Sequence, residues 1–126
     1  MKKLFVSLCC IILVALGFAN VQAGTFDEVS QAKYGAIMIY ADWADNLQPV
    51  MTNFGTMEQA YAGKYSFAKI NIASEDAKEF NKKNYIYPNL PYILLFKERG
   101  RMSRCITREC ASNPTCLKEK MELFAN

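Results

Sequence analysis

The chain alternates between short, wholly apolar runs and segments in which apolar residues recur every three or four positions. Ala36–Tyr40 is an uninterrupted apolar run, which predicts a strand buried on both faces. After a polar turn, apolar residues recur at helical spacing as far as Gly63, namely Leu47, Val50, Met51, Phe54, Met57 and Tyr61. A buried strand therefore leads into a helix through an exposed loop. Asn46 is placed to cap this helix, and Pro49 falls in its first turn.

Two further elements flank this unit. Thr25 and Glu28 have the spacing of a capping box, which predicts a short helix over about Phe26–Lys33 that ends at Gly35. After the longer helix, the pattern over Tyr65–Ile72 is typical of a strand. The unit is thus preceded by a helix and followed by a second strand.

The last third of the chain predicts a short helix, a hairpin and a closing helix. Ser74 is placed to cap a helix that ends near Asn84. A later apolar run leads through a turn at Arg99-Gly100 into a return strand over about Arg101–Thr107. Pro114 suits the start of a final amphipathic helix, whose apolar positions are Leu117, Met121 and Phe124. The order of elements predicts an α/β domain, with a mixed sheet of about four strands flanked by helices.

The N-terminal segment has the features of a signal peptide. Lys2 and Lys3 precede an uncharged apolar run over Leu4–Phe18, and Asn20–Ala23 supplies the small residues of a cleavage site. The alternative is an uncleaved anchor, but the run is shorter than the ~20 residues that a membrane span needs. We therefore expect residues 1–23 to be removed, leaving residues 24–126 as one secreted domain, in the bacterial periplasm, with no stable membrane anchor.

Charge excludes one class of partner. Without Lys2 and Lys3, the 15 basic residues fall to 13, against 12 acidic ones, so a general nucleic-acid binder is not expected. The basic residues cluster late in the chain, where Lys97, Arg99, Arg101, Arg104 and Arg108 stand against the single acid Glu98. The cluster is typical of a solvated hairpin, and an anion-binding site is the alternative.

Three segments resemble thioredoxins. Ala41-Asp42-Trp43 followed by Ala44-Asp45-Asn46-Leu47 resembles the stretch in which a buried strand leads into the Cys-x-x-Cys motif at the first turn of a helix. Asn89-Leu90-Pro91-Tyr92, continuing to Phe96-Lys97, resembles the segment with the family's cis-proline, and Lys69-Ile70-Asn71-Ile72 resembles a third family segment. The resemblance implies a thioredoxin-like fold and a cis peptide bond at Pro91.

The catalytic groups of that family are missing. Ala44 and Leu47 occupy the two cysteine positions, and Met38 stands where the family keeps a buried acid. Thiol–disulfide exchange needs a thiolate and a second sulfur, so we expect no redox chemistry at this loop. The chain has no His, which removes the usual general base and the commonest zinc ligand, and we expect neither a cofactor nor a metal.

The cysteines that follow the signal peptide leave three interpretations open. Cys105, Cys110 and Cys116 all lie in the last quarter of the chain. An oxidising compartment favours a structural disulfide between Cys110 and Cys116, with Cys105 free or paired between chains. The alternatives are a displaced redox pair, which would make the protein a thiol–disulfide oxidoreductase, and a three-cysteine metal site, which lacks a fourth ligand.

The resemblance also suggests where a partner binds. In thioredoxins, extended polypeptide lies in a groove beside the cis-proline, and that contact needs no sulfur. Here the groove would be formed by Trp43, Asp45 and Asn46 on one side and by Leu90, Pro91 and Tyr92 on the other. Trp43 and Tyr92 would serve as aromatic anchors, although Trp43 could instead pack against its own loop. We therefore expect a protein or an extended peptide as the partner.

Overall fold

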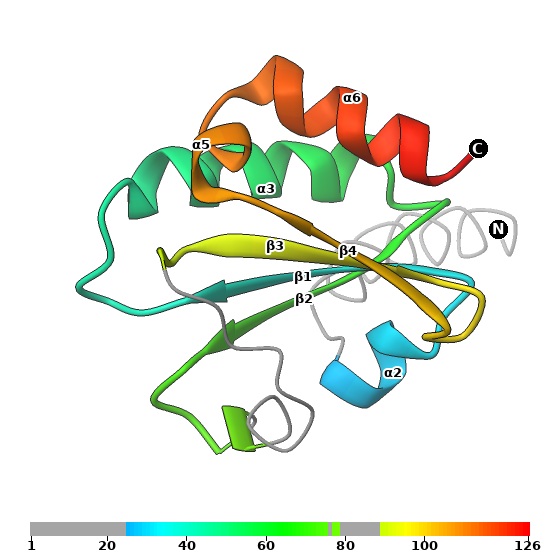
Figure 1. Ribbon diagram of the computed structural model, residues 1–126, viewed down its shortest axis with the longest axis horizontal. Helices are drawn as coiled ribbons and strands as arrows, with labels where there is room; N and C mark the ends of the chain where they lie inside the picture. Colours follow the sequence, from blue (N-terminus) through cyan, green and yellow to red (C-terminus); the bar gives the residue numbers. More distant parts are fainter. Residues whose placement is uncertain (1–24, 76, 79–88) are drawn as a thin grey trace, which may run out of the picture.

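The computed structural model describes residues 25–75, 77–78 and 89–126 (Figure 1). The predicted signal peptide and Gly24 lie outside the described residues, as does most of the helix predicted from Ser74 to Asn84. Within the described ranges, no helix has the length and apolar character to cross a membrane.

Four strands form one mixed sheet, as predicted. They are β1 (Tyr34–Tyr40), β2 (Ser66–Asn71), β3 (Tyr92–Lys97) and β4 (Met102–Ile106). Their order across the sheet is β2-β1-β3-β4, so β1 and β3 are central. β1 runs parallel to β2, whereas β3 is antiparallel to both β1 and β4. The central strands are buried on both faces, which explains their uninterrupted apolar sequences.

Helices cover both faces of this sheet. α3 (Leu47–Ala60), α5 (Arg108–Ala111) and α6 (Pro114–Phe124) lie on one face, and α2 (Phe26–Ser30) lies on the other (Figure 1). α5 was not predicted, because four residues are too few to produce a helical repeat of apolar positions. The arrangement is the α/β fold expected from the order of elements.

The sheet separates two hydrophobic clusters, because alternate residues of a strand point to opposite faces. The cluster beneath α3, α5 and α6 includes Met38, Phe54, Ile93, Leu95, Ile106, Leu117 and Met121. The cluster on the α2 side includes Phe26, Ile37, Ile39, Leu90, Tyr92, Leu94 and Phe96. Met38 is therefore an ordinary core residue on the larger-helix face, and it is fully buried.

Gly35 does not end a helix. The Thr25–Glu28 capping box is present, but α2 ends at Ser30, and Gly35 lies inside β1. A Cβ atom at position 35 would overlap the backbone carbonyl of Val29. The glycine therefore serves the close packing of α2 against the central strand. The prediction that it terminates the helix was wrong.

The turn between β3 and β4 uses three successive residues with positive φ. Glu98, Arg99 and Gly100 have φ values of 56°, 57° and 87°. A Cβ atom on Gly100 would lie 3.1 Å from the carbonyl oxygen of Ser30. Gly100 therefore satisfies both the backbone conformation and the close approach to α2. The turn falls at the predicted position.

A disulfide joins the two C-terminal helices. Cys110 of α5 is bonded to Cys116 of α6, with their Cα atoms 5.2 Å apart, as predicted, and Cys105 is free. The side chain of Asn113 accepts hydrogen bonds from the backbone N–H groups of Thr115 and Cys116, at 3.0 and 3.1 Å. The bond and the cap together define the corner between α5 and α6.

Candidate functional site

The loop at residues 41–46 connects the end of β1 to the start of α3 and exposes the only tryptophan of the chain. The Ala44 N–H donates a 3.1 Å hydrogen bond to the Ala41 carbonyl, which closes a turn around Trp43. The Trp43 side chain is 74% exposed. It therefore does not pack against its own loop, and that interpretation was wrong.

Asn46 is the N-cap residue of α3, but its side chain does not cap the helix. The Val50 N–H donates to the Asn46 carbonyl at 3.2 Å, which is the first hydrogen bond of the helix. Asn46 itself has φ 59° and ψ 23°, and its side chain makes no capping hydrogen bond. N-cap side chains reach the first helical N–H groups from an extended backbone, which this left-handed conformation does not provide. The predicted side-chain cap was wrong.

Ala44 and Leu47 do not lie across one helical turn. α3 begins only at Leu47, which packs against the cluster beneath α3, α5 and α6. Ala44 precedes the helix and packs against the cluster on the α2 side of the sheet. The left-handed residue between them, Asn46, redirects the chain, so the two positions that the resemblance assigns to cysteines lie against different cores.

The Leu90–Pro91 peptide bond is cis, as the resemblance implies. Leu90 belongs to the same hydrophobic cluster that Ala44 packs against, which brings this segment close to the Trp43 loop. Tyr92, however, is only 1% exposed. It pairs with Ile39 in the sheet, and strand alternation directs its ring into the α2-side core. The expectation that Tyr92 offers exposed aromatic area was wrong.

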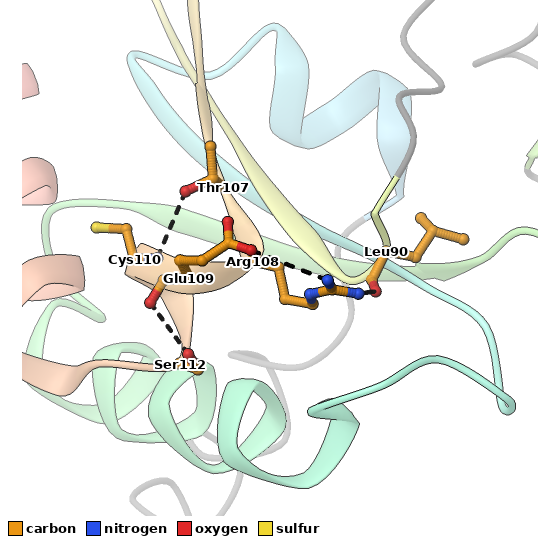
Figure 2. A network of polar contacts seen from close by, with 6 residues as sticks. All are labelled: Leu90, Thr107, Arg108, Glu109, Cys110 and Ser112. Carbon is orange, nitrogen blue, oxygen red and sulfur yellow. Dashed lines mark hydrogen bonds and ion pairs between the residues drawn. The ribbon is translucent and has the colours of Figure 1, made fainter.

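Arg108 also belongs to this region, although its sequence position predicted only a place in the basic cluster of the hairpin. Figure 2 shows its side chain reaching from the start of α5 to Leu90, where Nη1 donates a 3.3 Å hydrogen bond to the carbonyl oxygen. Nη2 lies 3.9 Å from a carboxylate oxygen of Glu109, and the Arg108 side chain is 23% exposed. A charged group is thus held against the residue that precedes the cis-proline. Arg108 and Leu90 are 18 residues apart, and the only sequence signal was the charge of Arg108.

The acidic side chains of the loop are solvated. Asp42 and Asp45 are both exposed. One carboxylate oxygen of Asp42 accepts a 3.4 Å hydrogen bond from the side-chain amide of Asn71 at the end of β2. The loop therefore carries negative charge beside Trp43, whereas the α5 side of the same region carries the positive charge of Arg108.

The free thiol is directed away from the disulfide. Cys105 pairs with Leu94, whose side chain faces the α2-side core, whereas its neighbour Ile106 packs on the opposite face, where Cys110 also lies. Strand alternation therefore places the Cys105 side chain on the α2 side. Although Cys105 as a residue is exposed, neighbouring atoms partly desolvate its thiol, and this burial raises the pKa. This placement does not support thiol–disulfide exchange between Cys105 and the Cys110–Cys116 disulfide.

Comparison with known proteins identifies the fold. No protein-family model matches the chain, and no curated protein sequence matches it. Among solved structures it is similar to a thioredoxin from Malassezia sympodialis, with 15% identity, a TM-score of 0.64, and coverage of 83% of this chain and 90% of that one. A thioredoxin from Plasmodium falciparum has 18% identity and a TM-score of 0.63 over 82% and 97% of the two chains. It is also similar to a thioredoxin f2 solved in complex with ferredoxin:thioredoxin reductase. The identity is 15% and the TM-score 0.64, and the match covers 83% of this chain and 94% of that one.

The sheet order, the helices on both faces and these likenesses show that the protein has a thioredoxin-like α/β fold. At these identities the likeness concerns the fold alone.

Proposed function

We propose that this protein is a secreted thioredoxin-like domain that has no redox activity at its Trp43 loop and acts by binding extended polypeptide. Its binding surface, which we call the Trp43 surface, consists of Trp43, Asp45 and Asn46 together with Arg108, whereas the predicted groove residues Leu90 and Pro91 are buried beneath it. The observation that carries the proposal is the exposure of Trp43, at 74%. Large aromatic side chains that are exposed in the free protein are the usual anchors of protein interfaces.

The chemistry of the loop supports binding over catalysis. Neither Ala44 nor Leu47 can form a thiolate or a mixed disulfide, and they pack against different cores. The carbonyl of the buried Leu90 accepts from Arg108, which holds this side chain beside the cis-proline. A bound peptide would use Trp43 for apolar contact and the polar side chains beside it for hydrogen bonds.

The alternative function is a thiol–disulfide oxidoreductase that uses Cys110 and Cys116. One observation favours it, because Cys110 lines an open surface pocket and is reachable from solvent. Two observations oppose it. Cys110 lies in a helix of only four residues, and the remaining thiol, Cys105, faces the other side of the sheet.

The binding proposal is tested with Trp43 as its own reporter, because the chain has a single tryptophan. The immobilised domain is screened with a library of uncharged, tryptophan-free heptapeptides, and each binder is titrated in solution. Binding at the Trp43 surface shifts the emission to shorter wavelength. Because Trp43→Ala has no tryptophan emission, the variant and the wild type are compared by isothermal titration calorimetry, and Trp43→Ala should weaken binding by more than about 1 kcal/mol, which is about fivefold.

The matched control is Leu123→Ala, which removes another strongly exposed apolar side chain, on α6. This variant should bind like the wild type, as should Arg99→Ala with Arg101→Ala. Absence of any binder, or binders that are indifferent to Trp43→Ala, would overturn the proposal. Secretion is tested separately: protein recovered from the periplasm should begin at Gly24 by mass spectrometry.

A further inference from the structure

The outer edge of β4 is a second surface with the features of a peptide-binding strand. β4 lies at the end of the sheet, and no described strand pairs with its outer side. Met102, Ser103, Arg104 and Cys105 are all exposed. An edge strand presents unpaired backbone N–H and C=O groups, which can pair with an added strand.

The side chains of this edge fall on two faces. Ile106 packs into the core beneath α6, and strand alternation places Arg104 and Met102 on the same face. On α6, Lys120 and Leu123 are three residues apart and therefore share one side of the helix. Met102 and Leu123 are 45% and 61% exposed. The edge thus combines two cations with two solvent-exposed apolar side chains.

A surface pocket of about 350 Å³ lies where β4 meets α5 and α6. It is lined by Arg104, Cys105, Ile106, Thr107, Cys110 and Lys120. Ile106 and Cys110 provide apolar walls, whereas Arg104 and Lys120 bring two positive charges. Neither of these two side chains has an acidic partner within the described ranges. The pocket is therefore suited to a carboxylate.

We propose that the β4 edge binds an extended acidic segment of a partner protein as an added strand, with one carboxylate of that segment in the pocket between Arg104 and Lys120. The positive charges of Arg104 and Lys120 favour an acidic segment as the ligand of this edge. A second copy of the domain is disfavoured, because pairing two β4 strands would bring the Arg104 side chains of both copies together. The same charges prevent aggregation of the free edge.

The geometry also specifies a sequence pattern for the segment. Side chains that face α6 occur at every second residue of an added strand. The acid that meets Arg104 should therefore have an apolar residue two positions away, where it meets Met102. A segment of the type apolar-x-acid-x-apolar satisfies this pattern whether it runs parallel or antiparallel to β4.

The experiment uses two peptides that differ in one residue. Acetyl-Thr-Val-Thr-Glu-Thr-Val-Thr-amide and the same peptide with Gln in place of Glu are titrated into the isotope-labelled domain, and amide resonances are followed by NMR. The Glu peptide should shift the resonances of residues 101–106 and leave those of residues 41–46 unchanged. The Gln peptide should bind at least fivefold more weakly.

Variants separate the charges of the pocket from a general effect of charge. Arg104→Gln with Lys120→Gln should weaken the Glu peptide at least fivefold and leave the Gln peptide unaffected. Lys118→Gln, an exposed lysine on the same helix but on another side, should change neither affinity. Trp43→Ala should also leave binding unchanged, which separates this site from the Trp43 surface. Failure of the Glu peptide to bind, equal binding of the two peptides, or shifts confined to residues 41–46 would each overturn the proposal.

Discussion

The phenolic hydroxyl of Tyr65 donates a 2.7 Å hydrogen bond to the backbone carbonyl of Met121, 56 residues further along the chain. Tyr34 donates to the Ala125 carbonyl at 3.1 Å, and the Lys97 ammonium donates to the Phe124 carbonyl at 3.0 Å. The Met121 carbonyl also accepts from the backbone N–H of Ala125 at 3.2 Å. Three side chains from the sheet region thus bond to carbonyls at the C-terminal end of α6 and attach it to the rest of the domain.

Tyr65→Phe should destabilise the domain by about 1–1.5 kcal/mol, because it removes a buried hydrogen bond to the Met121 carbonyl, which keeps only the Ala125 N–H as a donor. The free energy of unfolding is measured by urea denaturation. Tyr61→Phe is the matched control, since it removes an exposed hydrogen bond to Glu122 and should cost less than about 1 kcal/mol. Equal costs for the two variants would show that the Tyr65 hydroxyl does not anchor α6.

Removal of the disulfide should lower stability by about 2 kcal/mol, because the bond restricts the unfolded chain over a short loop. The variant is Cys110→Ser with Cys116→Ser, and Cys105→Ser is the control that should unfold like the wild type. Mass mapping of the non-reduced protein should give a link between Cys110 and Cys116. A dominant link that includes Cys105 would contradict the structure.

The purified domain should not reduce insulin disulfides above the background rate of dithiothreitol, because neither residue 44 nor residue 47 carries a thiol. Turnover is followed by the turbidity of precipitating insulin chains. Activity comparable to that of a thioredoxin would refute the proposed inactivity. Its loss in Cys110→Ser would then assign the activity to the C-terminal disulfide.

Ala44→Cys with Leu47→Cys should not form an intramolecular disulfide in the folded domain, since these side chains pack against different cores. Free thiols are counted after exposure of the folded protein to air. The same variant oxidised in urea is the control, because the unfolded chain has no such restriction. Complete oxidation of the folded variant would mean that the loop at residues 41–46 adopts a helical turn in solution.

Glu58 should make stability depend on pH. It lies largely buried on α3, 3.9 Å from the Lys69 ammonium, and burial raises its pKa while Lys69 opposes the shift. The folded state therefore holds this proton more tightly than the unfolded chain does, so stability falls as the pH rises above 4.5. Glu58→Gln should be more stable than the wild type at pH 7, and the difference should vanish below about pH 4.

Thermal unfolding across this pH range provides the measurement. Glu75→Gln, which changes an exposed carboxylate, should follow the wild type at every pH. A Glu58→Gln variant that is less stable than the wild type at pH 7 would show that the ion pair with Lys69 outweighs the effect of burial.

The sequence by itself determined the elements that depend on neighbouring residues. Uninterrupted apolar runs identified the central strands, and Pro114 and the capping box at Thr25 identified two helix starts. The Cys110–Cys116 disulfide was also predictable, because the two residues are only six apart. These features follow from local spacing and hydrophobicity, which can be read without knowing how the elements pack.

Only the tertiary structure decided which residues form the surfaces. Tyr92 was expected to be exposed, but the register of β3 against β1 directs it into the core. In the sequence, Arg108 is only one of several basic residues. The packing of α5 places its side chain against Leu90. These positions depend on sheet order and register, because contacts between distant segments arise from packing that no local pattern encodes.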